Sequence, residues 1–332
     1  MRKNFLKTFN RGLLLCAFAL SFGILSLLSG CAMDQSKILV SQATAGELVN
    51  PFLQDGQWYK AALHVHSTTS DGDVNVPERM KQYRENGYDI VAITDHWKTN
   101  KIDGLSDEKF LVINGMESHP GGNHFVCLNL PEGFEIKKDM DTQKAIDSVN
   151  AVGGGVIYAH PYWLGHSIVD MLSVNGYIGI EVYNGVCDLS ICKGYSSVHW
   201  DQLVGKGVML PAVATDDVHS SENINLGWTM IKAKELIAKE IIKSLETGCY
   251  YASCGPTIEE YRVEDGVAKI KCSPVSKICF GGQGAYGLVV NGQDGKLLTA
   301  AEWKLPEKCK FVRSEVIDAN GKHAWTNPIV LK

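Results

Sequence analysis

The chain has 332 residues, of which 45% are hydrophobic and 21% are charged, so it has enough apolar material for a large core and for more than one domain. This composition excludes intrinsic disorder, collagen and a coiled coil. The 32 Lys and Arg residues stand against 37 Asp and Glu residues, a net charge of -5, and this balance argues against a nucleic-acid partner.

The first 30 residues have the pattern of a bacterial export signal. Four basic residues, the last of them Arg11, precede an uncharged apolar run from Leu13 to Leu28. Ser29 and Gly30 then lead into Cys31, which resembles the lipobox that is cleaved before a lipid-modified cysteine. We expect an extracytoplasmic bacterial lipoprotein, periplasmic or on the cell surface, anchored to the membrane at Cys31. The alternative is an uncleaved anchor, because about 18 apolar residues can span a bilayer.

Removal of residues 1–30 would leave 28 Lys and Arg against 37 Asp and Glu, a net charge of -9, together with eight cysteines besides Cys31. In an oxidising compartment some of these cysteines could form disulfides, and the sequence leaves open whether they pair or stay reduced. No Cys-x-x-Cys motif is present, which argues against a zinc ribbon. The cysteines close enough in sequence to pair are Cys187 with Cys192, Cys249 with Cys254, and Cys272 with Cys279.

Residues 31–56 are polar with little periodicity and predict a tether. From residue 57 to 250, strand-like runs alternate with amphipathic helical stretches, which predicts an α/β fold with a parallel sheet closed as a barrel. In chain order we expect strand 59–66, helix 77–86, strands 89–95, 111–117 and 124–130, helix 141–152, strands 155–160 and 179–183, helix 196–204, strands 209–216 and 228–233, and helix 234–247.

Helical periodicity stops at about residue 250, and short strand-like runs separated by turn residues follow. They predict a small C-terminal β-sandwich-like domain over residues 251–332. The segment from Gly282 to Gly287 matches GxGxxG, but no helix follows it, so it is predicted to be a glycine-rich turn and not a dinucleotide site. The expected strands are 257–264, 267–273, 278–281, 287–290, 310–318 and 324–331.

Histidines and carboxylates gather at the ends of the predicted barrel strands. His64 and His66 alternate along one strand, so they face the same side about 6.6 Å apart and can converge on one ion. One His-x-His pair is weak evidence for a metal. However, α/β barrels assemble their active sites at one rim from many strands, so the whole series predicts a metal site. The further candidates are Asp71, His96, Glu117, His124, His160, Asp217 and His219.

Six histidines and three carboxylates exceed what one tetrahedral ion can use, so we expect two or three divalent ions. Imidazole and carboxylate without thiolate favour Zn²⁺, Mn²⁺ or Fe²⁺ over Mg²⁺ or Ca²⁺ alone. Glu117 could bridge two ions about 3.5 to 4 Å apart. A shared water whose pKa falls toward about 7 would then supply the hydroxide nucleophile of a hydrolase.

Five segments in this order, HVHSTTSDGD, AITDHW, NGMES, AHPYW and TDDVH, resemble the metal-binding motifs of the polymerase and histidinol phosphatase (PHP) superfamily. WYKAALHVHSTTSDGD, CYYASCGP and HAWTNPI are similar to its exported carbaryl-hydrolase-like (CehA/McbA) branch. The resemblance implies a distorted (β/α)₇ barrel and a metal-dependent hydrolase. It makes a phosphoester the leading small-molecule substrate and a carboxylic or carbamic ester the alternative.

The resemblance also implies three metal sites. His119 is the alternative to His124, which we favour because it opens its own strand, whereas a Pro-Gly-Gly turn follows His119. Asp71 takes a place that is His in some family members. The implied ligands are His64, His66, Glu117 and Asp217 for the first ion, Glu117, His124 and His160 for the second, and Asp71, His96 and His219 for the third.

Glu117 and Asp217 are the expected catalytic carboxylates, with Asp217 handling a proton. Asp95 and Asp216 sit beside ligands in the sequence and are expected to orient the histidines. For Glu181 the sequence leaves two roles open, orientation of a ligand and general acid.

The remaining candidates concern the substrate. Lys98 is the cation nearest to the ligand motifs in the sequence. No arginine lies near these motifs that could bind a phosphate through two hydrogen bonds. Trp97, Tyr162 and Trp163 could line a substrate pocket or pack in the core. A binding lipoprotein built on an inactive barrel is the rival interpretation, although it would be expected to have lost ligands. The histidines without a place in the pattern are His166, His199 and His323.

Overall fold

A computed structural model of the chain describes residues 48–331. The predicted export signal, the lipidation site Cys31 and most of the predicted tether lie outside the described residues. Among the described helices, none combines the length and the apolar character that a membrane span needs.

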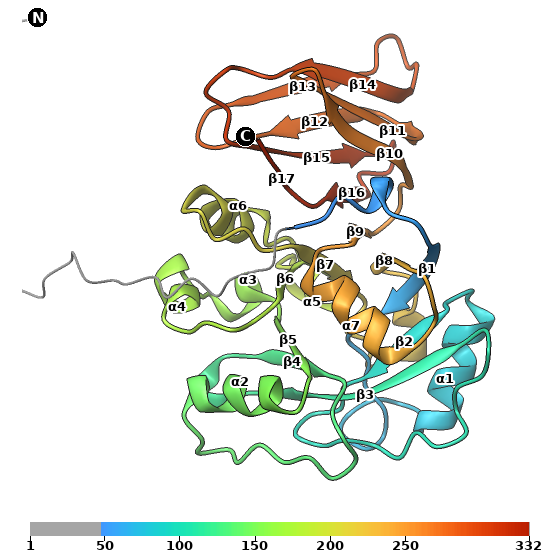
Figure 1. Ribbon diagram of the computed structural model, residues 1–332. Coiled ribbons are helices and arrows are strands. Elements are labelled where there is room, and N and C mark those ends of the chain that lie inside the picture. The colour runs from blue at the N-terminus through green and yellow to red at the C-terminus, as the bar shows by residue number, and fades with distance from the viewer. Residues whose placement is uncertain (1–47, 332) are drawn as a thin grey trace, which may run out of the picture. The chain divides into compact units, whose positions relative to one another are not determined.

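Seven strands follow one another around the first part of the structure, in the same order in space as in the chain (Figure 1). Neighbours pair in parallel except at β4, which runs antiparallel to both β3 and β5. A parallel bridge from Val65 to Val218, just past β1 and β7, joins the two ends of the row. The strands are β1 (Gln57–Ala62), β2 (Ile90–Ile93), β3 (Leu111–Ser118), β4 (Phe125–Leu128), β5 (Gly155–Tyr158), β6 (Gly179–Asn184) and β7 (Ala212–Thr215).

Helices lie beside these strands and bury one apolar face each. Helix α1 begins after Asn75, whose side chain accepts a hydrogen bond from the Glu78 amide, and Pro77 stands in its first turn. The structure confirms a mixed α/β fold. The helices are α1 (Val76–Glu85), α2 (Thr142–Ala151), α3 (Pro161–Leu164), α4 (Ile168–Leu172), α5 (Gly185–Ile191), α6 (Ser197–Gly205) and α7 (Ala238–Glu246).

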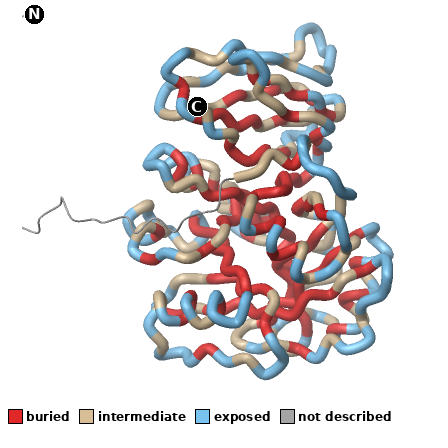
Figure 2. The backbone as a smooth tube through the Cα atoms, viewed as in Figure 1, coloured by how far each residue is buried: buried red, intermediate tan, exposed pale blue. Residues whose placement is uncertain are grey.

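Successive side chains of a strand point to opposite faces, so alternate residues of the strands contribute to the same part of the core. Ala61, Ile90, Val126 and Val213 belong to one buried cluster drawn from many of the strands, and Leu245 of α7 packs into the same cluster. In Figure 2 the buried backbone therefore runs along the strands, and the exposed backbone lies mainly in the loops and helices around them.

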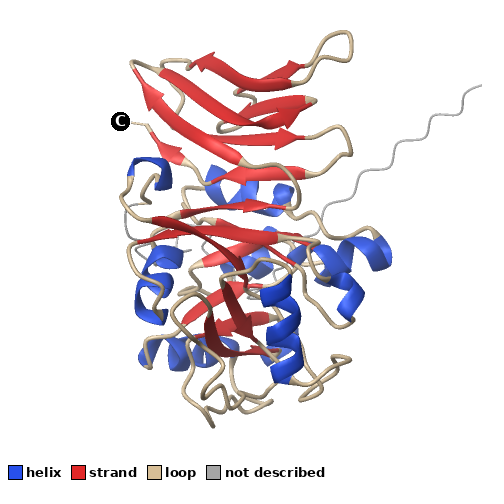
Figure 3. Cartoon of the chain, turned by 90° about the vertical axis from the view of Figure 1, so that its right-hand side faces the viewer, coloured by secondary structure: helices blue, strands red, loops and turns tan. Residues whose placement is uncertain are grey.

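After α7 the described chain contains only strands, and Figure 3 shows them gathered at one end. The main sheet continues from β1 through β8, β9, β16, β15 and β12 to β13, while β10, β11 and β14 form a separate sheet. The two sheets share a buried apolar cluster that includes Tyr261, Ile270, Phe280 and Val312. The strands are β8 (Trp228–Ala233), β9 (Tyr250–Ser253), β10 (Ile258–Glu264), β11 (Val267–Val275), β12 (Lys277–Gly281), β13 (Gly287–Asn291), β14 (Leu298–Lys304), β15 (Phe311–Ile317), β16 (His323–Thr326) and β17 (Ile329–Val330).

The sheet runs through the predicted domain boundary at residues 250 and 251, because β9 pairs with β8 on one side and with β16 on the other. The separate C-terminal sandwich domain therefore stays a prediction. At the other boundary, packing starts before residue 57: the Asn50 side chain donates to the Tyr261 carbonyl at 2.7 Å, and Phe52 lies against Trp58.

Several elements differ from the sequence prediction. Strand β1 ends at Ala62 and not at His66, although the bridge at Val65 keeps the next residues extended. β9, β14 and the short helices α3, α4 and α5 were not predicted. All eight cysteines of the described residues are free thiols, so no disulfide links them here. The glycine-rich segment from Gly282 is the turn between β12 and β13, as predicted.

Candidate metal centre

The fold brings all nine predicted ligands to one rim of the seven strands. Most of them follow the carboxyl ends of parallel strands, where such sites are built. His124 precedes its strand, but β4 is reversed, so its amino end meets the carboxyl ends of β3 and β5. The Ala159 amide donates to the His124 carbonyl at 3.0 Å, which ties the two segments together.

The first group contains His64, His66, Glu117 and Asp217, whose ligand atoms lie within 4.8 Å of one another. The Nε2 atom of His64 is 3.2 Å from Glu117 Oε2 and 3.2 Å from Asp217 Oδ1. The Nε2 atom of His66 is 3.4 Å and 3.2 Å from the same two oxygens. These are the four residues that the resemblance implies for one ion.

Glu117 is shared with a second group. Its Oε1 atom lies 2.8 Å from His124 Nδ1 and 3.2 Å from His160 Nε2. His119 is farther away, with its Nε2 atom 3.7 Å from the same oxygen, and its ring stacks on His124 at a centroid distance of 3.8 Å. His119 also forms a possible ligand group with His96 and Glu117. The choice of His124 over His119 as a ligand therefore stays a prediction.

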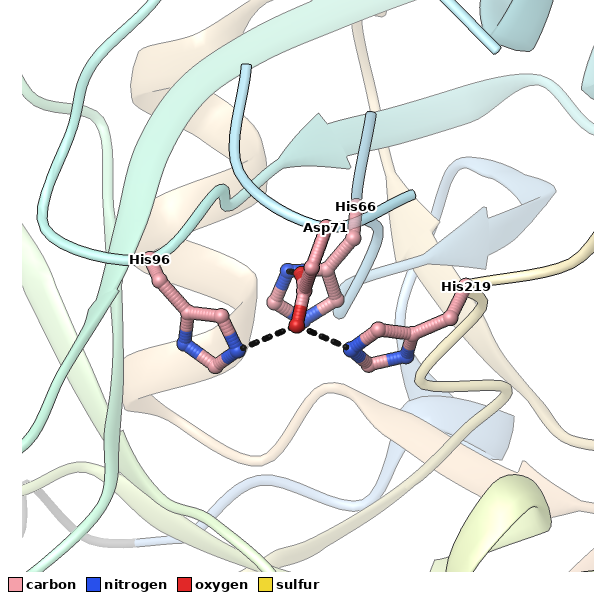
Figure 4. A group of neighbouring side chains, drawn as sticks. All are labelled: His66, Asp71, His96 and His219. Carbon is pink, nitrogen blue, oxygen red and sulfur yellow. Dashed lines mark ion pairs between the residues drawn. The ribbon is translucent and has the colours of Figure 1, made fainter. Parts of the chain in front are cut away.

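The third group contains Asp71, His96 and His219 together with His66, which the sequence analysis had placed only in the first group. In Figure 4 the Asp71 carboxylate lies between the imidazole rings. Its Oδ2 atom is 3.3 Å from His96 Nε2 and 3.4 Å from His219 Nε2. Asp71 is about half exposed, whereas Glu117 is buried, so this group lies at the outer side of the centre.

The donor atoms of the first group fit a divalent cation. His64 Nε2, His66 Nε2 and Asp217 Oδ1 are buried and have no hydrogen-bond partner among the described residues. Leaving a buried polar atom unpaired is costly, so three such atoms aimed at one point indicate a bound ligand. Imidazole nitrogens and carboxylate oxygens are the donors that Zn²⁺, Mn²⁺ and Fe²⁺ accept, so the residues present fit such ions.

The charge of the centre also calls for cations. Burial opposes ionisation of Glu117 and Asp217, but the imidazoles around them hold the pKa of both carboxyls below the ordinary value. Burial likewise opposes protonation of His64, yet Asp217, Glu181 and Glu117 together raise the pKa of its ring. The buried carboxylates thus stay ionised and attract positive charge.

Glu181 forms four hydrogen bonds next to the ligand groups. Its Oε1 atom accepts from His64 Nδ1 at 2.7 Å and from Thr215 Oγ1 at 2.8 Å, and its Oε2 atom accepts from the His160 amide at 2.8 Å and from Asn184 Nδ2 at 2.9 Å. The hydrogen bond from His64 Nδ1 to Glu181 fixes the His64 ring with Nε2 facing the other ligands of the first group. Of the two roles that the sequence left open, these contacts favour orientation.

Asp95 and Asp216 do not contact the ligand histidines, which corrects the prediction that they orient these rings. Asp95 accepts from the backbone and side chain of Ser67 and from Ser70, so it holds the loop after His66. Asp216 accepts from two tyrosine hydroxyls and from the Leu226 and Gly227 amides. Both carboxylates thus hold neighbouring loops and side chains and accept no hydrogen bond from the ligand rings.

Three residues at the centre have the left-handed backbone that side chains usually avoid. Asp217 has φ 56° and His160 has φ 27°, and Trp97, which follows a ligand, has φ 60°. Such strain persists only where surrounding structure imposes it, and it concentrates at functional sites. It supports the assignment of this rim as the functional end of the molecule.

A cavity of about 340 Å³ opens onto the ligands. Asp71, Glu117 and His160 are among the polar residues that line it. Trp163, one of the three aromatic residues singled out in the sequence, also lines it, together with residues of α5 that were not singled out: Val186, Cys187 and Ser190. The sequence did contain a signal for the start of α5, because asparagine is a favoured residue before the first turn of a helix. In the structure the Asn184 side chain accepts a hydrogen bond from the Cys187 amide at 3.0 Å.

No protein-family model matches the chain, and no curated protein matches it. A two-domain protein from Bacteroides vulgatus, described as containing a predicted PHP-like metal-dependent phosphoesterase, is 18% identical over 86% of this chain and 98% of its own, with a TM-score of 0.50. PsfC from Pseudomonas syringae is 12% identical over 57% and 87%, with a TM-score of 0.43. A candidate metal-dependent phosphoesterase from Bifidobacterium adolescentis is 14% identical over 57% and 96%, with a TM-score of 0.40.

The likeness to the Bacteroides protein shows a shared fold, and it extends over most of the chain. The other two likenesses are weaker and add no argument. The Bacteroides protein, which shares the fold, is thus described as PHP-like, and the described residues of this chain include clustered groups that could hold divalent ions.

Proposed function

We propose that this chain is a metal-dependent hydrolase of the PHP superfamily, of the carbaryl-hydrolase-like branch, and that it cleaves a phosphoester. The observation that carries the proposal is the set of overlapping ligand groups that share Glu117, with buried donor atoms that no hydrogen bond satisfies. Two or three ions of Zn, Mn or Fe would be held by the nine residues named above.

When bound, such ions lower the pKa of a coordinated water and polarise the ester oxygen that gains charge. The chain itself provides the geometry. Glu117 joins the first two groups, and Glu181 keeps His64 in the required tautomer. Asp217 has Oδ1 at the centre and accepts from Asn184 with Oδ2 at 3.1 Å, and we propose that this carboxylate handles the proton of the reaction.

An alternative substrate is a carboxylic or carbamic ester, and one observation favours it. The residues that line the cavity include no lysine or arginine that would neutralise a phosphate. Lys98, the cation nearest in sequence, does not line the cavity, and its Nζ donates to the Thr69 carbonyl at 3.2 Å. An ester without negative charge needs no such clamp.

The test is to purify the full chain without chelator, measure metals per chain by elemental analysis, and assay a panel of phosphomonoesters, phosphodiesters and carboxylic esters. Two to three equivalents of metal with turnover of one ester class would support the proposal and choose the class. A chain that holds no metal, stays inactive and resists reconstitution would contradict it in favour of the binding lipoprotein.

We also propose that the enzyme works outside the cytoplasm, held to the membrane by a lipid on Cys31. The support is the sequence pattern alone. Cys31→Ser is expected to release the protein from the membrane fraction and to change its electrophoretic mobility, whereas an unchanged distribution and mobility would contradict lipidation.

A further inference from the structure

Arg79 is a fully buried arginine in α1, a helix whose other charged side chains are exposed. It does not line the cavity, and no role was assigned to it from the sequence. Its guanidinium donates from Nε to the His66 carbonyl at 3.0 Å and from Nη2 to the His219 carbonyl at 3.3 Å. One side chain thus holds the backbone of two predicted ligands.

Asp73 and Ser221 complete this arrangement. The Asp73 carboxylate pairs with Arg79 through one oxygen, and its other oxygen accepts from both the amide and the hydroxyl of Ser221 at 2.8 Å. The Asp73 amide donates to the His219 carbonyl at 2.8 Å. We call Arg79, Asp73 and Ser221 the Arg79 clamp, because together they join the segment after β1 to the segment after β7.

The two joined segments carry three of the four residues of the third group, His66, Asp71 and His219. The loop between His66 and Asp73 is folded tightly, since a Cβ atom on Gly72 would lie 2.7 Å from the His66 carbonyl carbon. Asp71 itself is half exposed, and among the described residues its side chain accepts a hydrogen bond only from Ser70, at 3.0 Å. Its position therefore depends on how the backbone of this loop is held.

The first group shares only His66 with the contacts of the clamp, and the second group shares none. Glu117 is part of β3, and Glu181 of β6 fixes the His64 ring. His124 and His160 flank β4 and β5, and among the described residues neither forms a hydrogen bond with the clamp. Loss of the clamp should therefore disturb the third group more than the other two.

We propose that the Arg79 clamp positions the third ligand group, and that it determines whether an ion binds there, although none of its three residues touches the ion. Arg79 is thus a positioning residue for the outermost site. The inference rests on the proposed function, because it assumes that the ligand groups hold metal ions.

The experiment measures Zn²⁺ binding to the full chain by competition with a chelator and by elemental analysis after dialysis. Arg79→Gln and Asp73→Asn are compared with the wild type, and Arg84→Gln is the matched control. Arg84 lies on the same helix and pairs with Asp107 at 2.6 Å in an exposed ion pair away from the ligands. We expect both clamp variants to lose about 10- to 100-fold in affinity for one zinc equivalent, the range typical of groups that hold ligands in place.

The remaining equivalents should lose less affinity than this one, because the clamp contacts only His66 of the first group and no residue of the second, and Arg84→Gln should change nothing. Because removing a buried arginine also costs stability, Asp73→Asn decides the question if Arg79→Gln does not fold. The double variant should lose no more zinc affinity than either single variant, since the residues act as one unit.

If Asp73→Asn binds every zinc equivalent with wild-type affinity, the proposed role of the Arg79 clamp is wrong, and the proposed hydrolase function is unaffected. Equal weakening of all equivalents would overturn that role as well, because a general loss of structure would explain that result. A wild-type chain that binds no zinc would instead overturn the proposed function, independently of the variants.

Discussion

The metal centre and the C-terminal strands treat buried charge in opposite ways. In the C-terminal region Arg313 is buried, but its guanidinium donates to both oxygens of Asp201 at 2.8 and 2.9 Å, and Glu315 pairs with His323 at 2.6 Å. At the centre, His64, His66 and Asp217 are equally buried and have ligand atoms without partners. Charged groups that pair with one another point to stability, whereas buried metal-ligand atoms that come together without partners point to a ligand.

The largest effect is expected at Glu117, which two groups share. Glu117→Gln should lower kcat/KM by more than about 100-fold, the upper end for residues that only orient ligands, and should reduce the metal content. Esterase assays and elemental analysis check this. Glu315→Gln, which changes a partly buried carboxylate in the other region, is the control and should keep full activity; equal losses in both variants would break the contrast between the regions.

Phe280 tests the other side of the comparison, because it is buried in the apolar cluster of the C-terminal strands. Phe280→Ala should lower the free energy of unfolding by about 3 to 5 kcal/mol through the cavity that it leaves. Urea unfolding measures the loss. Metal content per folded molecule should stay at the wild-type level, and a loss of metal from the folded variant would show that the regions are not independent.

A variant of Glu181 tests whether a carboxylate that orients a ligand affects metal binding. Glu181→Gln keeps the shape but removes the charge that holds His64 Nδ1, so affinity for zinc should fall about 10- to 100-fold. Chelator competition measures the affinity. Unchanged binding would mean that the ring of His64 is oriented without the carboxylate.

The smallest effect concerns acid stability in the C-terminal region. Burial alone would raise the pKa of Glu315, but His323 and Arg313 hold it below its ordinary value. A lowered pKa contributes stability above the ordinary carboxyl pKa, and that contribution is lost as the pH falls through the lowered value. Metal-free wild type should therefore lose more Tm between pH 7 and 3 than metal-free Glu315→Gln, and parallel losses would contradict the assignment.

Much of the rim could be predicted because strand ends leave a local signal. Glu117 closes an apolar run and His160 closes another, and both lie at the carboxyl ends of β3 and β5 or just beyond them. The strand at 228–233 was predicted with the bounds that the structure has. Whether these residues bind metal stays a prediction, although the structure brings them together.

The parts that could not be predicted depend on contacts between distant segments. Arg79 is one charged residue in a polar helix, and its partners His66 and His219 lie 13 and 140 positions away, so no local pattern reveals it. Asp95 and Asp216 show the reverse case. Their adjacency to ligands in the chain suggested contact with the rings, but their carboxylates turn toward backbone amides and hydroxyls instead.

The double pairing of β9 has a consequence for any shortened form of this protein. A chain that ended directly after β9 would lack β16, and the row of amide and carbonyl groups that β9 now presents to β16 would become a free edge. Unprotected edges of this kind recruit strands from other molecules and lead to aggregation. The C-terminal strands therefore protect the half of the molecule that carries the ligand groups from aggregation, whatever else they do.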